Sequence, residues 1–172
     1  MRGRAAARVI LVVALALLFQ TTVVLDVRIG GVSPNVMILL PIAAGVAAGP
    51  IEGAGVGFVA GLAADLLSPT PLGLSALVGT IVGFGVGALS GGMVREVRGL
   101  PTVVALGASA VAVILYAVLG ALLGEPQFLH VNLALVVAVV AVANALLAGL
   151  AVRLMRRALG SPADQLAAGS IR

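Results

Sequence analysis

Two carboxylates lie in apolar stretches of this chain, and by type they are the residues best suited to proton or ion chemistry. Asp65 falls near the end of the apolar run 51–67. A charged side chain at the centre of a membrane costs about 2.5–3.5 kcal/mol on insertion scales and is usually kept for function. Near the end of a run that cost falls. For Asp65, capping the turn 68–73 or meeting interfacial water therefore competes with a functional role.

Glu52 has a simpler structural interpretation. It follows Gly49 and Pro50, which break the chain, so it occupies the first turn of the next helix. The helix dipole favours a carboxylate at that position. We prefer this structural role, and a partner contact on the inner face stays open.

The other polar side chains form no catalytic set. A single His cannot make a multi-histidine metal site, the absence of Cys excludes thiolate chemistry, and the glycines at 83, 85 and 87 lack the Lys of a phosphate-binding loop. We expect no enzyme activity, no metal and no cofactor. The scattered polar residues are Gln20, Ser109, Tyr116, His130 and Asn144.

Composition predicts the elements that hold these residues. The chain has 172 residues, of which 62% are hydrophobic and 9% charged, and the mean hydropathy is +1.27. This is typical of an all-α integral membrane protein, and the length suits a compact bundle of six transmembrane helices with short loops. Residues 1–159 form one domain, and the polar tail 160–172 is expected to be disordered. No basic patch interleaved with aromatics is present, which argues against nucleic-acid binding.

Six apolar runs are the predicted spans. The first is expected to be an uncleaved span, because residues 20–22 offer no small-x-small cleavage site. The second is short; Pro34 suits its helix start, and Pro41 predicts a kink or a re-entrant shape. The predicted spans are 8–25, 36–48, 51–67, 72–93, 101–123 and 128–152.

The arginines predict the orientation of the bundle. Nine of the ten basic residues fall on one side of the six spans and only Arg28 on the other. The positive-inside rule then puts both termini in the cytoplasm. If the second run did not span, Arg95 and Arg98 would fall outside, against that rule.

Glycines at every fourth position form stripes on two neighbouring runs. Such stripes let two helix backbones approach closely. We prefer internal packing of the two runs against each other, and a groove for a partner helix is the alternative that the glycines alone cannot exclude. The stripes are Gly53, Gly57 and Gly61 on the third run and Gly79, Gly83 and Gly87 on the fourth.

The order of motif residues resembles the MreD family of bacterial rod shape-determining membrane proteins. Size and six apolar runs agree with that family, and the resemblance covers about the first half of the chain well. The family often has an aspartate where Asn35 stands, although an Asn can still cap a helix. The motif residues are Pro34, Asn35, Gly49, Pro50, Glu52, Gly53, Gly57, Phe58, Gly61, Leu62, Asp65, Leu66, Leu67, Ser68, Pro71, Leu72, Gly73 and Leu74.

This resemblance implies a non-enzymatic scaffold of the cell-elongation complex in the bacterial inner (cytoplasmic) membrane. Its implied partners are MreC, a single-span protein, and through it MreB and the RodA and transpeptidase pair that build peptidoglycan. Membrane lipid surrounds it, and a homodimer stays open.

Two other functions were weighed. A small-solute binding subunit similar to those of vitamin transporters needs several convergent polar or aromatic groups, which the spans supply sparsely. A proton-coupled carrier using Asp65 lacks a visible paired base.

Overall fold

The computed structural model describes residues 3–24, 31–68, 70–90, 99–125 and 132–160. Within them the chain forms six α-helices and a short π-helical turn, with no strand. The helices are α1 (Gly3–Phe19), continued by the π-turn η1 (Gln20–Val24), α2 (Leu39–Ala48), α3 (Pro50–Asp65), α4 (Leu74–Leu89), α5 (Leu100–Leu122) and α7 (Leu133–Leu159).

Three of these helices are long and apolar enough to cross a membrane. They are α1 with its π-turn, counted over Ala5–Thr22, together with α5 and α7. At 1.5 Å per residue the 16 residues of α3 and of α4 extend only about 24 Å, less than a hydrocarbon core of about 30 Å. The all-α prediction is confirmed for the described residues, and the six-span topology stays a prediction.

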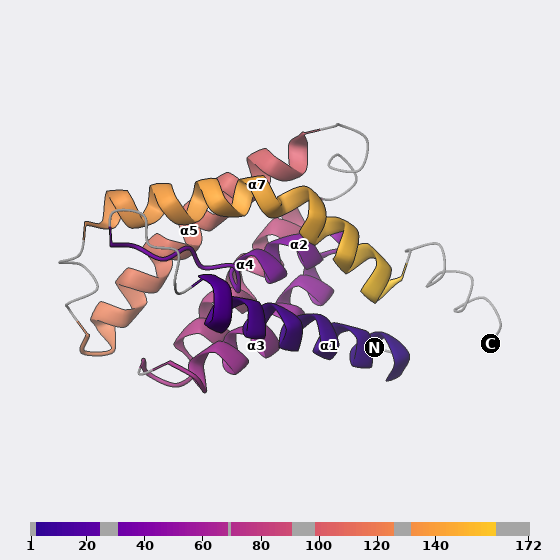
Figure 1. Cartoon of the computed structure of the whole chain (residues 1–172), viewed down its shortest axis with the longest axis horizontal. Coiled ribbons are helices and arrows are strands. Elements are labelled where there is room, and N and C mark those ends of the chain that lie inside the picture. Colours follow the sequence, from indigo (N-terminus) through magenta and orange to yellow (C-terminus); the bar gives the residue numbers. More distant parts are fainter. Residues whose placement is uncertain (1–2, 25–30, 69, 91–98, 126–131, 161–172) are drawn as a thin grey trace.

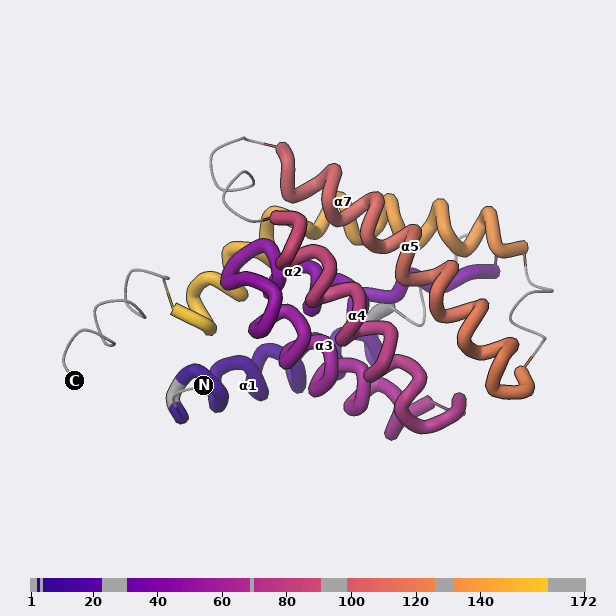
Figure 2. The backbone as a smooth tube through the Cα atoms, turned by 180° about the vertical axis from the view of Figure 1, so that it is seen from behind, coloured from indigo at the N-terminus to yellow at the C-terminus, as the bar shows by residue number. Residues whose placement is uncertain are grey.

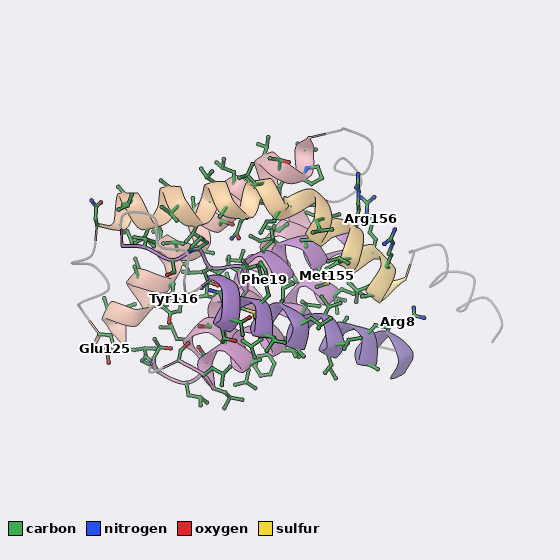
Figure 3. The ribbon with its side chains drawn as sticks, in the orientation of Figure 1. Arg8, Phe19, Tyr116, Glu125, Met155 and Arg156 are labelled. Carbon is green, nitrogen blue, oxygen red and sulfur yellow. The ribbon has the colours of Figure 1, made fainter. Side chains whose placement is uncertain are left out.

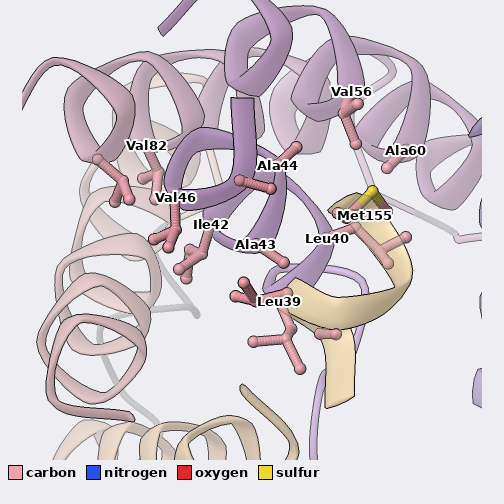
Figure 4. Close-up of a cluster of buried hydrophobic side chains, with 14 of the residues drawn as sticks. Leu39, Leu40, Ile42, Ala43, Ala44, Val46, Val56, Ala60, Val82 and Met155 are labelled. Carbon is pink, nitrogen blue, oxygen red and sulfur yellow. The ribbon is translucent and has the colours of Figure 1, made fainter. Parts of the chain in front are cut away.

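Helix α2 lies at the centre of the bundle. Nine of its ten residues are buried, and it contacts α3, α4, α5 and α7. Its side chains form the middle of the apolar core with residues such as Val56 and Met155 (Figure 4). An apolar helix buried on all sides needs no polar face, which explains its uninterrupted hydrophobic sequence.

The start of the second predicted span differs from expectation. The helix begins at Leu39, not Val36, and Pro34 lies in the non-helical stretch before it. Pro41 lies in the first turn of α2, where no intrahelical bond uses its missing N–H, so it produces neither the kink nor the re-entrant shape that we predicted. The non-helical residues 31–38 run from the end where α7 begins to the middle of the bundle, where α2 takes over (Figure 2).

The other predicted boundaries deviate at the ends. α7 continues to Leu159, seven residues beyond the predicted end, because its arginines point outward and suit the last turns of the helix. The first residues of α1 and the last turn of α7 lie at the same end of the molecule (Figure 1). His130 lies outside the described residues. So do five of the arginines on which the predicted orientation rests, namely Arg2, Arg28, Arg95, Arg98 and Arg172.

Candidate functional site

The glycine stripes bring α3 and α4 into backbone contact. A Cβ added at Gly79 would lie 2.6 Å from the carbonyl oxygen of Gly57, and one at Gly83 would lie 2.6 Å from the carbonyl carbon of Gly53. Distances under 3.0 Å are essentially never found for real Cβ atoms. We call this contact the glycine seam, formed by Gly53, Gly57 and Gly61 of α3 and by Gly79, Gly83 and Gly87 of α4.

The glycine seam is closed by the chain itself. The stripe of α3 faces α4, and the stripe of α4 faces α3 and the Gly49–Pro50 turn before it. A third helix joins through Gly45 of α2, where an added Cβ would lie 2.6 Å from the Gly83 carbonyl oxygen. The glycines therefore take part in internal packing of α3 against α4, and Gly57, Gly61 and Gly79 also line a cavity. The sequence signal for Gly45 is its four-residue spacing to Gly49, and the predicted glycine stripes did not include it.

Asp65 joins the end of α3 to the beginning of α4. Its side chain is 3% exposed. Oδ2 accepts hydrogen bonds from the backbone N–H groups of Gly73 at 2.8 Å and of Ala76 at 3.3 Å, and both carboxylate oxygens lie 3.1 Å from the Ser75 nitrogen. A helix leaves its first four N–H groups without intrahelical partners. Asp65 accepts from three of these donors of α4 and so caps that helix, while the Leu74 N–H donates to the Pro71 carbonyl oxygen.

The turn carrying these donors depends on Gly73. Its φ of +97° lies in the left-handed region, where a residue with a side chain is strained. The left-handed turn directs the N–H groups of α4 toward Asp65. Gly49 (φ +107°) makes a similar sharp break before Pro50, which starts α3, and Glu52 occupies the first turn as predicted.

The motif residues at the surface have a different character. Phe58 is 53% exposed and Leu66 is 67% exposed, and Leu62 lies between them one turn from each. Their four-residue spacing places Phe58, the half-buried Leu62 and Leu66, the C-cap residue, along one side of α3. Pro71 is half-buried in the turn before α4. This outward stripe, Phe58, Leu62 and Leu66, is not explained by packing within the chain.

Gln20 holds the non-helical stretch before α2, a role that the sequence did not reveal. Its Nε2 donates to the Pro34 carbonyl oxygen at 2.9 Å, and its Oε1 accepts from the Val36 nitrogen at 2.8 Å. Non-helical backbone inside a membrane protein must find such internal partners. Asn35 does not cap α2 as expected; its Oδ1 accepts from the Met37 nitrogen at 3.1 Å, and Ile38 holds the N-cap position.

Asn144 and Ser109 also pair across the bundle. The Asn144 Nδ2 atom donates to the Ser109 Oγ atom at 3.0 Å, and both residues are fully buried. They lie on α7 and α5, so this bond joins two of the long helices. The two residues are 35 positions apart, so their pairing is not visible in the sequence.

A cavity of about 280 Å³ lies beside the glycine seam, at the end of the bundle that contains the Asp65 cap. It is bounded by the segment before α2 and Pro41 of that helix, by α3 from Gly57 onward, by α4 up to Val82, by the second half of α5 and by the first turns of α7. Tyr116 of α5 lines it and is labelled in Figure 3. The polar residues that line it are Ser33, Asn35, Ser68, Ser75 and Tyr116. These side chains were scattered in the sequence, and the fold brings them to one cavity.

Comparison with known proteins identifies the chain. The family model described as rod shape-determining protein MreD matches residues 3–158. The chain belongs to the MreD family. The match also covers α5 and α7, beyond the first half of the chain that carries the resemblance. No curated protein matches this chain, and no solved structure matches it.

Membership of the MreD family implies a role in determining rod shape. The described residues contain no group of three or more His, Cys, Asp or Glu that could hold a metal ion. The two carboxylates of the motif lie at the first turn of α3 and beneath the first turn of α4. In this MreD family member both acids thus sit where helix ends have unpaired N–H groups.

Proposed function

We propose that this MreD family member is a non-enzymatic scaffold of the bacterial cell-elongation complex and that it binds the membrane span of MreC. The observation that carries the proposal is the family match over residues 3–158. The structure adds a mechanical reason. The α3–α4 hairpin is held by backbone contact and by the Asp65 cap, so it presents a rigid outer face.

The surface proposed for MreC is the outward stripe of Phe58, Leu62 and Leu66. The glycine seam is a contact between α3 and α4, so we propose the stripe, and not the glycines, as the surface for MreC. The stripe consists of motif residues, of which Phe58 and Leu66 are exposed and Leu62 is half-buried. Helix association in lipid depends on van der Waals packing and not on hydrophobic burial, and an aromatic ring supplies a large packing surface.

Copurification of MreC with the tagged full chain from bacterial membranes tests this proposal. The amount of MreC that copurifies with the double variant Phe58→Ala, Leu66→Ala should be lower by a factor of about five or more. The reason is that anchor residues of an interface typically contribute more than about 1 kcal/mol each to the binding free energy. Phe84→Ala is the matched control, because Phe84 is 52% exposed on the neighbouring helix α4 and lies outside the motif. Equal retention by the double variant and the control would refute the stripe. Failure of the unaltered chain to retain MreC would refute the binding itself.

Through MreC, the proposed complex supports MreB and the RodA and transpeptidase pair during peptidoglycan synthesis. Cells depleted of this protein should lose rod shape, and expression of the unaltered chain should restore it. Restoration by the stripe variant at normal protein levels would contradict a function that depends on MreC contact.

We further propose a multi-pass position in the inner membrane with both termini in the cytoplasm. Arg8 and Arg156 lie at one end of the molecule and Glu125 at the other (Figure 3). The chain has no Cys, so single cysteines can report the orientation. In spheroplasts, a membrane-impermeant maleimide should label Leu123→Cys and not Arg157→Cys; the reverse pattern would invert the topology.

A further inference from the structure

We propose that the cavity beside the glycine seam binds an uncharged amphiphile, with hydroxyl or amide groups at one end and an alkyl chain at the other. The cavity holds about 280 Å³. That is room for roughly nine atoms at the share of volume that a water molecule has in the liquid, about 30 Å³. A short chain or the end of a longer one fits that space.

The lining is graded along the helices. Ser68 lies beyond the end of α3 and Ser75 in the first turn of α4, so both of these hydroxyl groups of the lining lie near helix ends. Val78 and Val82 follow one and two turns deeper along α4. A ligand that satisfies both regions has hydrogen-bonding groups near the helix ends and an apolar part directed into the bundle.

The same graded order is seen on the segment before α2 and on α5, whereas α7 contributes only apolar residues. Ser33 and Asn35 precede α2, whereas Pro41 in its first turn lies deeper. On α5, Tyr116 lies closer to the helix end than Val113. The polar end of the lining is therefore shared by several elements of the chain and is not a feature of one helix terminus.

The described lining favours an uncharged headgroup. No Arg, Lys, Asp, Glu or His is among the described residues that line the cavity. Asp65 lies nearby, but its carboxylate already accepts N–H bonds from the first residues of α4. A charge placed here would lose its hydration without gaining a counter-charge, which is costly. The ligand is therefore neutral, and its source is the surrounding membrane leaflet.

The cavity contains its own reporter. Tyr116 is the only Tyr of the chain, and there is no Trp, so the intrinsic fluorescence of the protein comes from the cavity wall. The full chain in nanodiscs of an aliphatic polymer is titrated with 1-monooctanoylglycerol, and tyrosine emission is recorded. We expect a saturable change in emission. Octanoate, which has the same chain with a charged head, should bind at least about tenfold more weakly, and glycerol should give no saturation over the same range.

Two variants locate the binding site. Val136→Phe fills the cavity from α7, and Val137→Phe is its matched control, since Val137 is also half-buried and does not line the cavity. Val136→Phe should weaken binding at least about tenfold, a factor equivalent to 1.4 kcal/mol. Ser75→Ala removes a hydroxyl and keeps the backbone N–H that bonds Asp65; it should weaken binding about fivefold, or roughly 1 kcal/mol.

Four results would overturn the proposal. They are no saturable response in the unaltered chain, equal affinity for octanoate, saturation by glycerol alone, and unchanged affinity in both Val136→Phe and Ser75→Ala. The titration needs no MreC, so its outcome is separate from that of copurification. If Val136→Phe does not fold, shown by loss of helical circular dichroism, Ser75→Ala decides the question of location.

Discussion

Replacing Gly57 with alanine puts a methyl group directly into the glycine seam. The added Cβ would lie 2.8 Å from the Thr80 nitrogen, and still closer to the Gly79 carbonyl group. Ordinary van der Waals contact begins at 3.4 Å, so the backbone of α4 must retreat by at least about 0.6 Å. Because the obstructing atoms are backbone, no side-chain rotation can relieve the overlap.

The cost follows from that displacement. A radial gap of 0.5–1 Å forfeits about a quarter to a half of the dispersion energy of the separated contacts. Overpacking of this kind typically destabilises by about 1–3 kcal/mol. Gly55→Ala is the matched control on the same helix, because nothing lies within 4 Å of its added Cβ. Higher helix propensity should make that variant neutral or more stable by up to about 1 kcal/mol.

Equilibrium unfolding in mixed micelles, followed by far-ultraviolet circular dichroism as the share of denaturing detergent rises, measures both variants. We expect Gly57→Ala to be less stable than Gly55→Ala by about 1–3 kcal/mol, the cost of overpacking alone, because the gain in helix propensity is common to both variants. Equal stability of the two variants would show that α3 and α4 are not in backbone contact at Gly57, and the packing argument would fail.

Two further predictions concern the polar clamps. Asp65→Asn replaces one carboxylate oxygen by an NH₂ group, which cannot accept from the N–H groups now bound, such as that of Gly73. The free energy of unfolding in the same assay should fall by about 1–3 kcal/mol. A decrease below about 0.3 kcal/mol would contradict the cap. Gln20→Leu removes the acceptor of the Val36 N–H and the donor to the Pro34 carbonyl. Hydrogen exchange at the Val36 amide should then be at least about fivefold faster, and unchanged exchange would refute the clamp.

The sequence predicted the local character of the helices well. The ends of the helix predicted at 101–123 agree with α5 to within one residue. Gly99, with its positive φ, directly precedes the helix, and Pro101 favours a first helical turn, so local backbone preferences define the start of the helix. Glu52 was placed correctly in a first turn for the same reason. Pro34 and Pro41 were misassigned because a proline suits both a helix start and an extended stretch, and only the surrounding helices decide between them.

Contacts between distant residues were beyond reach of the sequence. Gln20 lies 14 and 16 positions from its two partners, and Asn144 lies 35 from Ser109. Neither pairing follows a helical or strand period, so no pattern predicts it. The polar residues of the cavity converge for the same reason, through the arrangement of five elements.

The sequence alone determined the local structure of the protein: the apolar helices, the breaks between them at Gly49 and Gly73, and the glycine spacing that lets two helices approach closely. These properties depend on composition, backbone conformation and a period of about four residues, all of which are local. Only the tertiary structure decided what each feature contacts. It turned the glycine stripes inward on each other, placed Asp65 beneath the first turn of α4, and left the stripe beginning at Phe58 outward. The physical reason is that a helix face has no partner until another helix is packed against it.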